Sequence, residues 1–256
     1  MAHISFSELK TWDECPFKRK LTYQDKIKLF TSNEYTIFGT SMHETCEKSM
    51  LGKIKEEDCS DYFETSFKDA IEKVKTEIVL NETLVKDMVT QGKDIFKDLF
   101  AAIKEYLGEY EVIACEEQLM ESIDDCEDYN FKGFIDLIVK TSDGKYHIID
   151  YKSCGWGWDM KKKTHPMTTY QLTLYKKFYS KKLNIPLDLI ETHFCLLKRT
   201  AKKNRVELFR VTSGDKKMEN ANLLLTKAVS AIKSNKHIKN RLSCEKCEFH
   251  KTKHCP

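Results

Sequence analysis

The sequence predicts an α+β protein in which a small sheet is flanked by helices and preceded by a helical insertion. The insertion is predicted from residues 60–110, which are charged, lack proline and place apolar side chains such as Phe63, Phe67 and Ile71 at helical spacing. The sheet is predicted from three segments with the β-branched and aromatic content of strands, at residues 112–122, 129–140 and 145–152.

The flanking elements are predicted from the same kinds of pattern. Residues 5–23 are expected to form a helix with Ser7 as its N-cap, and residues 38–51 a second helix. Beyond the sheet, helices are predicted at 168–183 and 218–233, and strands at 191–198 and 205–211. No internal repeat or low-complexity linker interrupts these patterns. We therefore expect residues 1–256 to form a single domain, with its insertion at about 52–110.

Composition narrows the class of protein. The 256 residues are 41% hydrophobic, which is enough to bury a sizeable core. No apolar run approaches the roughly 18 residues that a membrane span needs. The first residues contain no basic segment leading into an apolar one, so we expect a cytoplasmic protein without a secretory signal.

Charge is distributed unevenly along the chain. Residues 43–130 contain 10 Lys and Arg against 24 Asp and Glu, whereas residues 152–205 contain 13 against 3. A solvated charged face would explain either run alone. The reversal of sign between them favours a surface for a polyanion on the second segment.

The most informative segment is a predicted hairpin. Asp143-Gly144 between two apolar runs is typical of a turn between antiparallel strands. With a three-residue loop at 142–144, Asp136 lies opposite Asp150, and side chains in that relation have Cβ atoms about 5 Å apart. A two-residue turn would shift the register and separate the two carboxylates.

Two opposed carboxylates among apolar neighbours repel each other unless a cation bridges them, and Mg²⁺ prefers such oxygen ligands. Lys152 follows Asp150 by two residues, so the strand period places both side chains on one face. Two carboxylates, a cation and an ammonium group are what phosphodiester hydrolysis needs. The alternative is a solvent-facing strand edge with an incidental Asp–Lys pair.

The spacing Gly133-x-x-Asp136, followed by Asp150-Tyr151-Lys152, resembles the PD-(D/E)XK nuclease superfamily. Within it, the sequence is most similar to RecB-like nucleases, which include helicase–nuclease subunits and the iron–sulfur nucleases of CRISPR adaptation. The resemblance implies a restriction-endonuclease-like fold with a mixed central sheet. It also implies a site for Mg²⁺ or Mn²⁺ in which the carbonyl of Tyr151 is a further ligand.

Three more motifs carry the resemblance. Gly39-Thr-Ser-Met-His43-Glu44 is similar to the family's G-x-x-x-H-E helix, which makes His43 a metal ligand. Ile113-Ala-Cys-Glu116-Glu117 is similar to the strand that bears an extra glutamate; Glu116 fits better, and Glu117 stays open. The third motif is similar to the family's DNA-contacting Q-x-x-x-Y helix, and its residues here are Gln171 and Tyr175.

Four cysteines suggest a second centre. Cys244-x2-Cys247-x7-Cys255 brings three thiols together at the end of the chain, a spacing that suits a metal. Cys15, followed by Pro16, resembles the N-terminal cysteine of the iron–sulfur branch of the family, which implies a [4Fe–4S] cluster on these four residues. The alternative is a structural Zn²⁺ that uses His250 or His254. The other six cysteines are scattered singly and are expected to be ordinary core residues.

These patterns together predict a metal-dependent DNA nuclease, an exonuclease acting on single-stranded DNA or DNA ends in repair, recombination or processing. Lys161, Lys162 and Lys163 are expected to bind DNA, and nearby aromatics such as Trp156 and Trp158 to stack on bases. No G-x-x-x-x-G-K-[ST] loop is present, so unwinding would require a helicase or recombination partner. The alternatives are a nuclease-fold binding module that does not cut, and an RNA-processing nuclease of the same chemistry.

Overall fold

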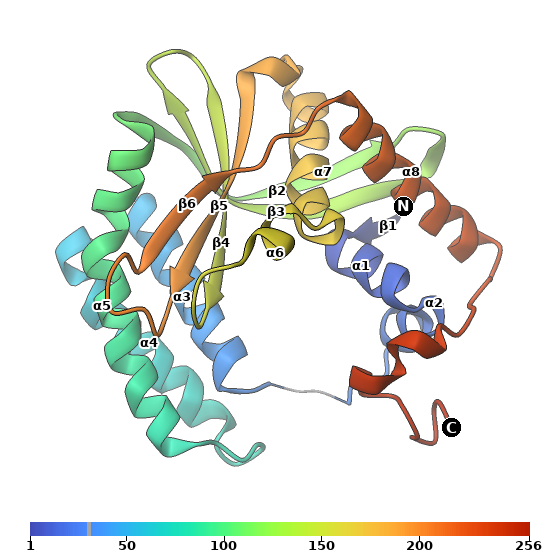
Figure 1. Cartoon of the computed structure of the whole chain (residues 1–256), viewed down its shortest axis with the longest axis horizontal. Helices are drawn as coiled ribbons and strands as arrows, with labels where there is room; N and C mark the ends of the chain where they lie inside the picture. The colour runs from blue at the N-terminus through green and yellow to red at the C-terminus, as the bar shows by residue number, and fades with distance from the viewer. Residues whose placement is uncertain (30–31) are drawn as a thin grey trace. The chain divides into compact units, whose positions relative to one another are not determined.

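The central element of the computed structural model, which describes residues 1–29 and 32–256, is a mixed six-stranded sheet (Figure 1). Its strands follow the order β1-β3-β4-β5-β6, with β2 pairing to β3. β3 and β4 are antiparallel, as are β5 and β6, whereas β1–β3 and β4–β5 are parallel. The strands are β1 Ala2–Ser5, β2 Tyr110–Ile123, β3 Cys126–Thr141, β4 Tyr146–Cys154, β5 Ile190–Lys198 and β6 Val206–Arg210. The α+β class and the mixed sheet flanked by helices are confirmed.

The chain forms two compact units. Unit 1 comprises residues 1–31, 118–133 and 213–256, and unit 2 comprises residues 32–117 and 134–212. No helix among the described residues is long and apolar enough to cross a membrane.

Unit 2 is a three-layer structure in which helices cover both faces of the strands (Figure 1). One face carries α3 Glu34–Met50, α4 Cys59–Val74 and α5 Glu82–Leu107, so the predicted insertion consists of two helices, α4 and α5. The other face carries α7 Pro166–Leu183. Its shorter elements are α6 Met160–Thr164 and the 3-10 turns η2 Glu56–Asp58 and η3 Leu187–Leu189.

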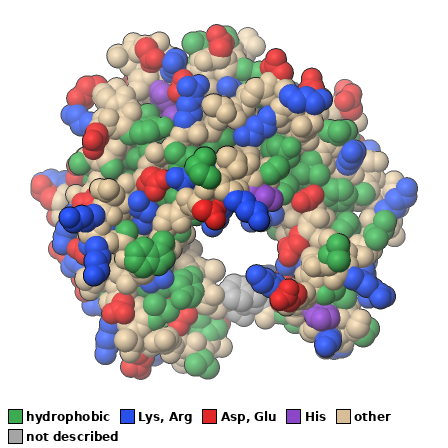
Figure 2. Space-filling model, viewed as in Figure 1, with side chains coloured by type: hydrophobic (Ala, Val, Ile, Leu, Met, Phe, Trp, Pro, Cys, Tyr) green, Lys and Arg blue, Asp and Glu red, His purple; other side chains and the backbone are tan. Residues whose placement is uncertain are grey.

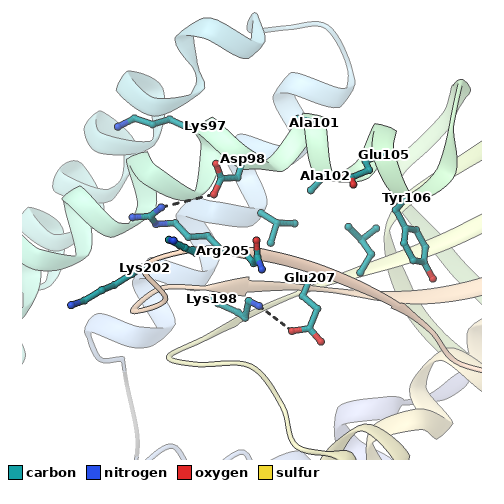
Figure 3. Close-up of a pocket in the computed structure, with 14 residues that line it drawn as sticks. Lys97, Asp98, Ala101, Ala102, Glu105, Tyr106, Lys198, Lys202, Arg205 and Glu207 are labelled. Atoms are coloured by element: carbon teal, nitrogen blue, oxygen red, sulfur yellow. Dashed lines mark hydrogen bonds and ion pairs between the residues drawn. The ribbon is translucent and has the colours of Figure 1, made fainter.

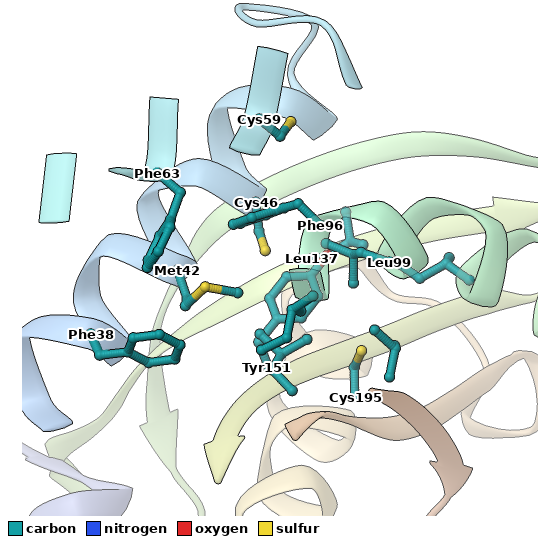
Figure 4. Close-up of a cluster of buried hydrophobic side chains, with 14 of the residues drawn as sticks. Phe38, Met42, Cys46, Cys59, Phe63, Phe96, Leu99, Leu137, Tyr151 and Cys195 are labelled. Atoms are coloured by element: carbon teal, nitrogen blue, oxygen red, sulfur yellow. The ribbon is translucent and has the colours of Figure 1, made fainter. Parts of the chain in front are cut away.

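The core of unit 2 lies between the sheet and the helices α3, α4 and α5 (Figure 4). Phe63 of α4 stacks on Phe67 with ring centroids 5.6 Å apart and meets the edge of Phe38 from α3 at 5.4 Å. α5 comes close at Gly92, where a Cβ would lie 2.1 Å from the Phe63 ring. Glycine is therefore required there for the two insertion helices to pack.

Unit 1 contains the short helices α1 Phe6–Glu14 and α2 Pro16–Arg19, the π-helical turn η1 Lys20–Gln24, helix α8 Asp215–Lys233 and the 3-10 segment η4 Arg241–Lys246. The predicted helix over residues 5–23 is thus interrupted. Cys15 adopts an extended conformation (φ −163°, ψ 112°) because the following Pro16 disfavours the helical one.

The prediction that Ser7 caps the first helix was wrong. Residues 2–5 form β1, which pairs in parallel with residues 129–132 of β3. The helix therefore begins at Phe6, and Ser5 is its N-cap, accepting a hydrogen bond from the backbone N–H of Glu8 at 3.1 Å.

Candidate active site

The β3–β4 hairpin has the register expected from the sequence. Leu137 pairs with Ile149 and Lys140 with Tyr146, and continuing this register by one residue places Asp136 opposite Asp150. The loop closes through a hydrogen bond from the backbone N–H of Thr141 to the carbonyl of Lys145 at 3.0 Å. Gly144 has a φ of +84°, a conformation that glycine adopts without strain, so the Asp-Gly turn determines the register.

Successive side chains of β4 alternate between the hydrophobic core and the candidate active site. Tyr151 points into the core shown in Figure 4, whereas Asp150 and Lys152 lie on the opposite face, toward α7. Asp150 is only 1% exposed. Its Oδ2 lies 2.6 Å from Nζ of Lys152, and its Oδ1 accepts a hydrogen bond from Nε2 of Gln171 at 2.9 Å.

Gln171 and Tyr175 lie behind this carboxylate. Nε2 of Gln171 also donates to the hydroxyl of Tyr175 at 3.2 Å, and Tyr175 is 5% exposed. Of the two residues expected to contact DNA, Gln171 therefore holds Asp150, and Tyr175 accepts a hydrogen bond from Gln171. The buried Tyr175 ring offers no open face to a base.

His43, Glu116 and Asp136 converge at the neighbouring position. One donor atom from each lies within 4.8 Å of the others. Nδ1 of His43 is 3.5 Å from Oδ2 of Asp136, and the same oxygen accepts the backbone N–H of Tyr151 at 2.7 Å. A nitrogen donor and two carboxylates at this separation form a ligand set that suits a divalent cation.

The structure also distinguishes the two candidate glutamates. Glu116 has a φ of +50°, unusual for a residue inside a strand, and its carboxylate joins His43 and Asp136. Glu117 forms an ion pair with Lys182 of α7 instead. A local departure from regular strand geometry at Glu116 thus directs its side chain to the site, as bulges in strands commonly do.

Helix α3 is brought against the end of β4 by a glycine. A Cβ on Gly39 would lie 3.2 Å from Oγ of Ser153, so a larger residue there would require the serine side chain to shift. One turn later His43 meets the edge of the Tyr151 ring, with centroids 5.9 Å apart. Glu44 points to α4, where it accepts hydrogen bonds from Tyr62 and Ser66 at 2.8 Å each. His43 therefore lies in the candidate site, whereas Glu44 binds helix α4 of the insertion.

Burial and the charge of Asp136 raise the proton affinity of the groups around it. Burial, assisted by Asp136 and opposed by Lys152, raises the pKa of Asp150 to about 6. Burial, and then the charge of Asp136, also raises the pKa of Glu116. Burial alone would lower the pKa of His43, but its contacts with Asp136 more than offset this, so its pKa is raised. Such a cluster accommodates a cation that displaces these protons.

The comparisons with known proteins agree with this geometry. A family model described as the PD-(D/E)XK nuclease superfamily matches residues 3–253. The chain belongs to this superfamily.

One solved structure resembles this nuclease in fold, and a second matches it less well. A protein named "Putative exonuclease" from Eubacterium rectale shares 11% identity with a TM-score of 0.61, over 98% of this chain and 88% of its own. The structure of SSO0001 shares 12% identity with a TM-score of 0.43, over 97% of this chain and 84% of its own. No curated protein matches the nuclease sequence.

Two hollows lie in unit 2 of the nuclease. One, of about 730 Å³, opens beside the candidate site and is lined by residues that include Tyr35, Thr40, His43, Glu116 and Ser153. The larger, of about 1040 Å³, lies between α5 and β6 (Figure 3). Its lining includes Arg205 and Lys198, which are paired with Asp98 and Glu207, and also Lys202 and Lys203, which have no ion-pair partner among the described residues. The smaller hollow is the better candidate for the reacting part of the substrate, because it is lined by His43 and Glu116 of the candidate site.

The basic segment is less uniform than its sequence suggests. Lys162 lies over the Trp158 ring at 4.4 Å, and Lys163 is paired with Glu207, while Lys161 is exposed. Figure 2 shows basic and acidic side chains interspersed over the visible face of α4 and α5. Arg205 pairs with Asp94 and Lys182 with Glu117, so part of the positive charge is neutralised by the acidic segment.

Sequence reasoning missed the β5–β6 turn as a candidate DNA contact. The exposed Lys202 and Lys203 form no ion pair with any residue that the structure describes. Arg199 donates a backbone hydrogen bond of 2.8 Å to Cys154 at the end of β4, and Thr200 donates one of 2.9 Å to Gly155 in the following loop. That loop carries Trp156, which is 69% exposed. The run Lys-Lys-Asn-Arg over residues 202–205 was the available signal.

The four singled-out cysteines line one cavity in unit 1. Cys15, Cys244, Cys247 and Cys255 all border a space of about 580 Å³. Cys15 is buried, and its Sγ accepts the backbone N–H of Asn240 at 3.3 Å. In the described parts of the chain, no three of these thiols, with or without His250 or His254, have donor atoms within 4.8 Å of one another.

Proposed function

We propose that this nuclease is a Mg²⁺- or Mn²⁺-dependent deoxyribonuclease. The observation that carries the proposal is the convergence of His43 and Glu116 on Asp136, directly opposite the buried Asp150–Lys152 pair. Carboxylates with one imidazole suit Mn²⁺ as well as Mg²⁺. When bound, the cation would supply Lewis-acid activation of water and of the scissile phosphate.

The side chains of the site would bind the cation and position the reacting groups. His43, Asp136, Asp150 and the carbonyl oxygen of Tyr151 would hold the cation. Lys152, whose Nζ is held at Asp150, would position the attacking water or a phosphate oxygen. Because contacts with Asp150 and Asp136 raise the pKa of Lys152 in spite of its burial, it acts as a charged donor.

Gln171 would act as a positioning residue, and Glu116 would strengthen the cation site. Gln171 fixes one oxygen of Asp150 from the rigid helix α7, which leaves the other oxygen to Lys152. Glu116 adds a second negative group beside His43 and Asp136, which increases the attraction of the site for a divalent cation.

A single-stranded substrate with a free end is the proposed preference. The exposed Trp156 offers a flat face for stacking, and stacking on aromatics does not depend on base sequence. Lys161, Lys202 and Lys203 are exposed in the neighbouring helix and turn and suit a flexible phosphate backbone. This assignment corrects the expectation for Trp158, which packs against Phe194 and Phe209. The "Putative exonuclease" name of the structural neighbour is compatible with cutting from an end.

We further propose that Cys15, Cys244, Cys247 and Cys255 hold a [4Fe–4S] cluster. Tetrahedral zinc with bonds of about 2.3 Å brings its sulfur ligands to about 3.8 Å from one another. The wider spacing found here, around a cavity of about 580 Å³, fits a multi-iron cluster better than a single ion.

One activity assay tests the central proposal. Purified protein is incubated with single- and double-stranded DNA and RNA in the presence of Mg²⁺, Mn²⁺ or EDTA. We expect metal-dependent cleavage of single-stranded DNA that is lost in Asp136→Asn and retained in Asp143→Asn, a control in the exposed turn. Binding without cleavage under every metal condition would support a non-cutting binding module, and preference for RNA would support an RNA-processing enzyme.

A further inference from the structure

A second group of metal-ligating side chains lies on β4 and β5, away from the candidate active site. His147 is opposite Glu191 in the parallel β4–β5 pair, and His193 is opposite Ile149. Donor atoms of His147, Glu191 and His193 lie within 4.8 Å of one another. The two imidazoles are 7% and 2% exposed.

Hydrogen bonds orient both rings. Nε2 of His147 is 2.9 Å from Oγ1 of Thr141, and Nδ1 of His193 is 3.3 Å from the hydroxyl of Tyr106. The other two nitrogens, Nδ1 of His147 and Nε2 of His193, face each other at 3.0 Å. If each ring donates its outer N–H to a hydroxyl, both inner nitrogens present lone pairs to the same point.

We propose that His147, His193 and Glu191 bind a transition-metal dication, with Zn²⁺ the best match. Two imidazoles and one carboxylate form a common zinc donor set. Histidine ligands of metals are usually oriented by a hydrogen bond from the outer ring nitrogen, which Thr141 and Tyr106 provide here. A pair of imidazole donors also disfavours Mg²⁺, which prefers oxygen ligands.

The carboxylate of Glu191 is already fixed by two cations. Lys145 and Arg210 contact the same oxygen, Oε1, at 3.0 and 3.2 Å. These contacts fix the orientation of the carboxylate. We assign its other oxygen, Oε2, as the metal ligand. The two cations weaken the attraction for a dication, so the imidazole nitrogens supply the larger part of the binding.

The site is separate from the nuclease chemistry. Asp150 lies three residues beyond His147, which is about 10 Å along a strand and on the opposite face of the sheet. A metal at the histidines would join the hairpin end, β4, β5 and, through Tyr106, helix α5. It would stabilise this end of unit 2 and would not take part in cleavage.

The test is metal binding to the full-length protein, with the nuclease site and the cysteines left intact. Zn²⁺ is titrated against a chromophoric chelator, and Co²⁺ against the visible spectrum, for wild type, His193→Gln and the control His3→Gln. We expect His193→Gln to lose one equivalent of Zn²⁺ and the corresponding Co²⁺ d–d bands, which lack thiolate charge transfer. His3→Gln, exposed in β1, should match wild type.

Two further conservative variants distinguish a loss of metal binding from a loss of folding. Glu191→Gln preserves the shape and can still accept from Lys145, and it should also lose this equivalent. Tyr106→Phe removes only the orienting hydroxyl, and should weaken Zn²⁺ binding by about 10- to 100-fold. If wild type and all these variants bind equal Zn²⁺ with equal affinity, the histidines are a hydrogen-bonded pair and the metal site is refuted.

Discussion

Asp136 and Asp150 lie opposite each other across the β3–β4 hairpin, but different partners hold their carboxylates. Oδ2 of Asp136 accepts the N–H of Tyr151 and lies 3.5 Å from His43, whereas Asp150 is bound by Gln171 and Lys152 through its two oxygens. A cation that bridges the carboxylates must therefore compete with Lys152 for Asp150. Occupancy of the metal site and the position of the lysine are coupled.

Removal of Asp150 or Lys152 should abolish cleavage. We expect Asp150→Ala and Lys152→Ala to lower the cleavage rate by more than about 100-fold, because each removes a group that acts on the reacting phosphate or its cation. Lys145→Ala, just before the first residue of β4, is the control and should cleave normally. Circular dichroism should show all three folded; undiminished cleavage by either site variant would disprove the assignment.

Metal affinity should rise with pH through the neutral range. The pKa of Asp150 is about 6, and that of His43 is raised above its usual 6.5, so both groups hold protons in acid. A cation binds the deprotonated forms, and its affinity should therefore fall as pH drops, by about tenfold per pH unit for each proton displaced. Mn²⁺ calorimetry between about pH 5 and pH 8 measures the slope. Asp150→Asn should flatten it, and a pH-independent affinity in wild type would contradict the site.

Anaerobically purified protein should be brown and lose its colour on oxidation, as thiolate-bound iron–sulfur clusters do. Cys15→Ser should lower the melting temperature, because it breaks a tether to the C-terminal cysteines whose closure is worth up to about 5 kcal/mol in the chain-entropy model. Cys126→Ser, in β3 of the same unit, is the matched control. A colourless protein that holds one zinc ion at these cysteines would disprove the cluster and support the zinc site instead.

DNA binding should weaken with salt. The lysines of α6 and of the β5–β6 turn would release counterions from phosphate, and removing one lysine–phosphate ion pair should reduce the salt slope by roughly 1. Charge reversal of Lys161, Lys202 and Lys203 is expected to flatten the dependence more than reversal of Lys162 and Lys163, which already have protein partners. Affinity measured in Ca²⁺ over a range of salt separates the two sets; equal effects would mean that the intramolecular contacts do not matter.

Linear single strands should be degraded, and covalently closed circles of the same sequence should resist. This follows from the proposed end preference, because a circle offers no terminus to enter the site. Trp156→Ala should weaken binding of the linear strand by about 1–3 kcal/mol if a base stacks there. Circles cut as fast as linear strands would identify an endonuclease, whatever the effect of the tryptophan.

The hairpin could be predicted from sequence because its determinants are local. A turn signal, two apolar runs and a period of two fix which residues face each other, and Asp136 and Asp150 follow by counting. The choice of Glu116 over Glu117 could be made only by resemblance. It depends on a left-handed backbone conformation in β2, which the alternation of side chains does not reveal.

Other features depend on contacts between distant segments. β1 has only four residues, and its partner on β3 begins at Tyr129. The motif of Gln171 and Tyr175 is visible in the sequence, but the hydrogen bonds that Gln171 donates to Asp150 and to Tyr175 follow from the placement of α7. Likewise, 46 residues separate His147 from His193, and no local spacing joins them.

The three-residue turn at 142–144 has a consequence for how this protein can change. If one of its residues were deleted and the turn kept its three-residue form, β4 would advance by one position and exchange its two faces, so that Tyr151 would take the place of Asp150. Such a deletion would damage the core and the chemistry in a single step, while many substitutions in the same turn would leave both intact. In evolution, this loop is therefore constrained more in the number of its residues than in their kind, except at Gly144, whose positive φ favours glycine.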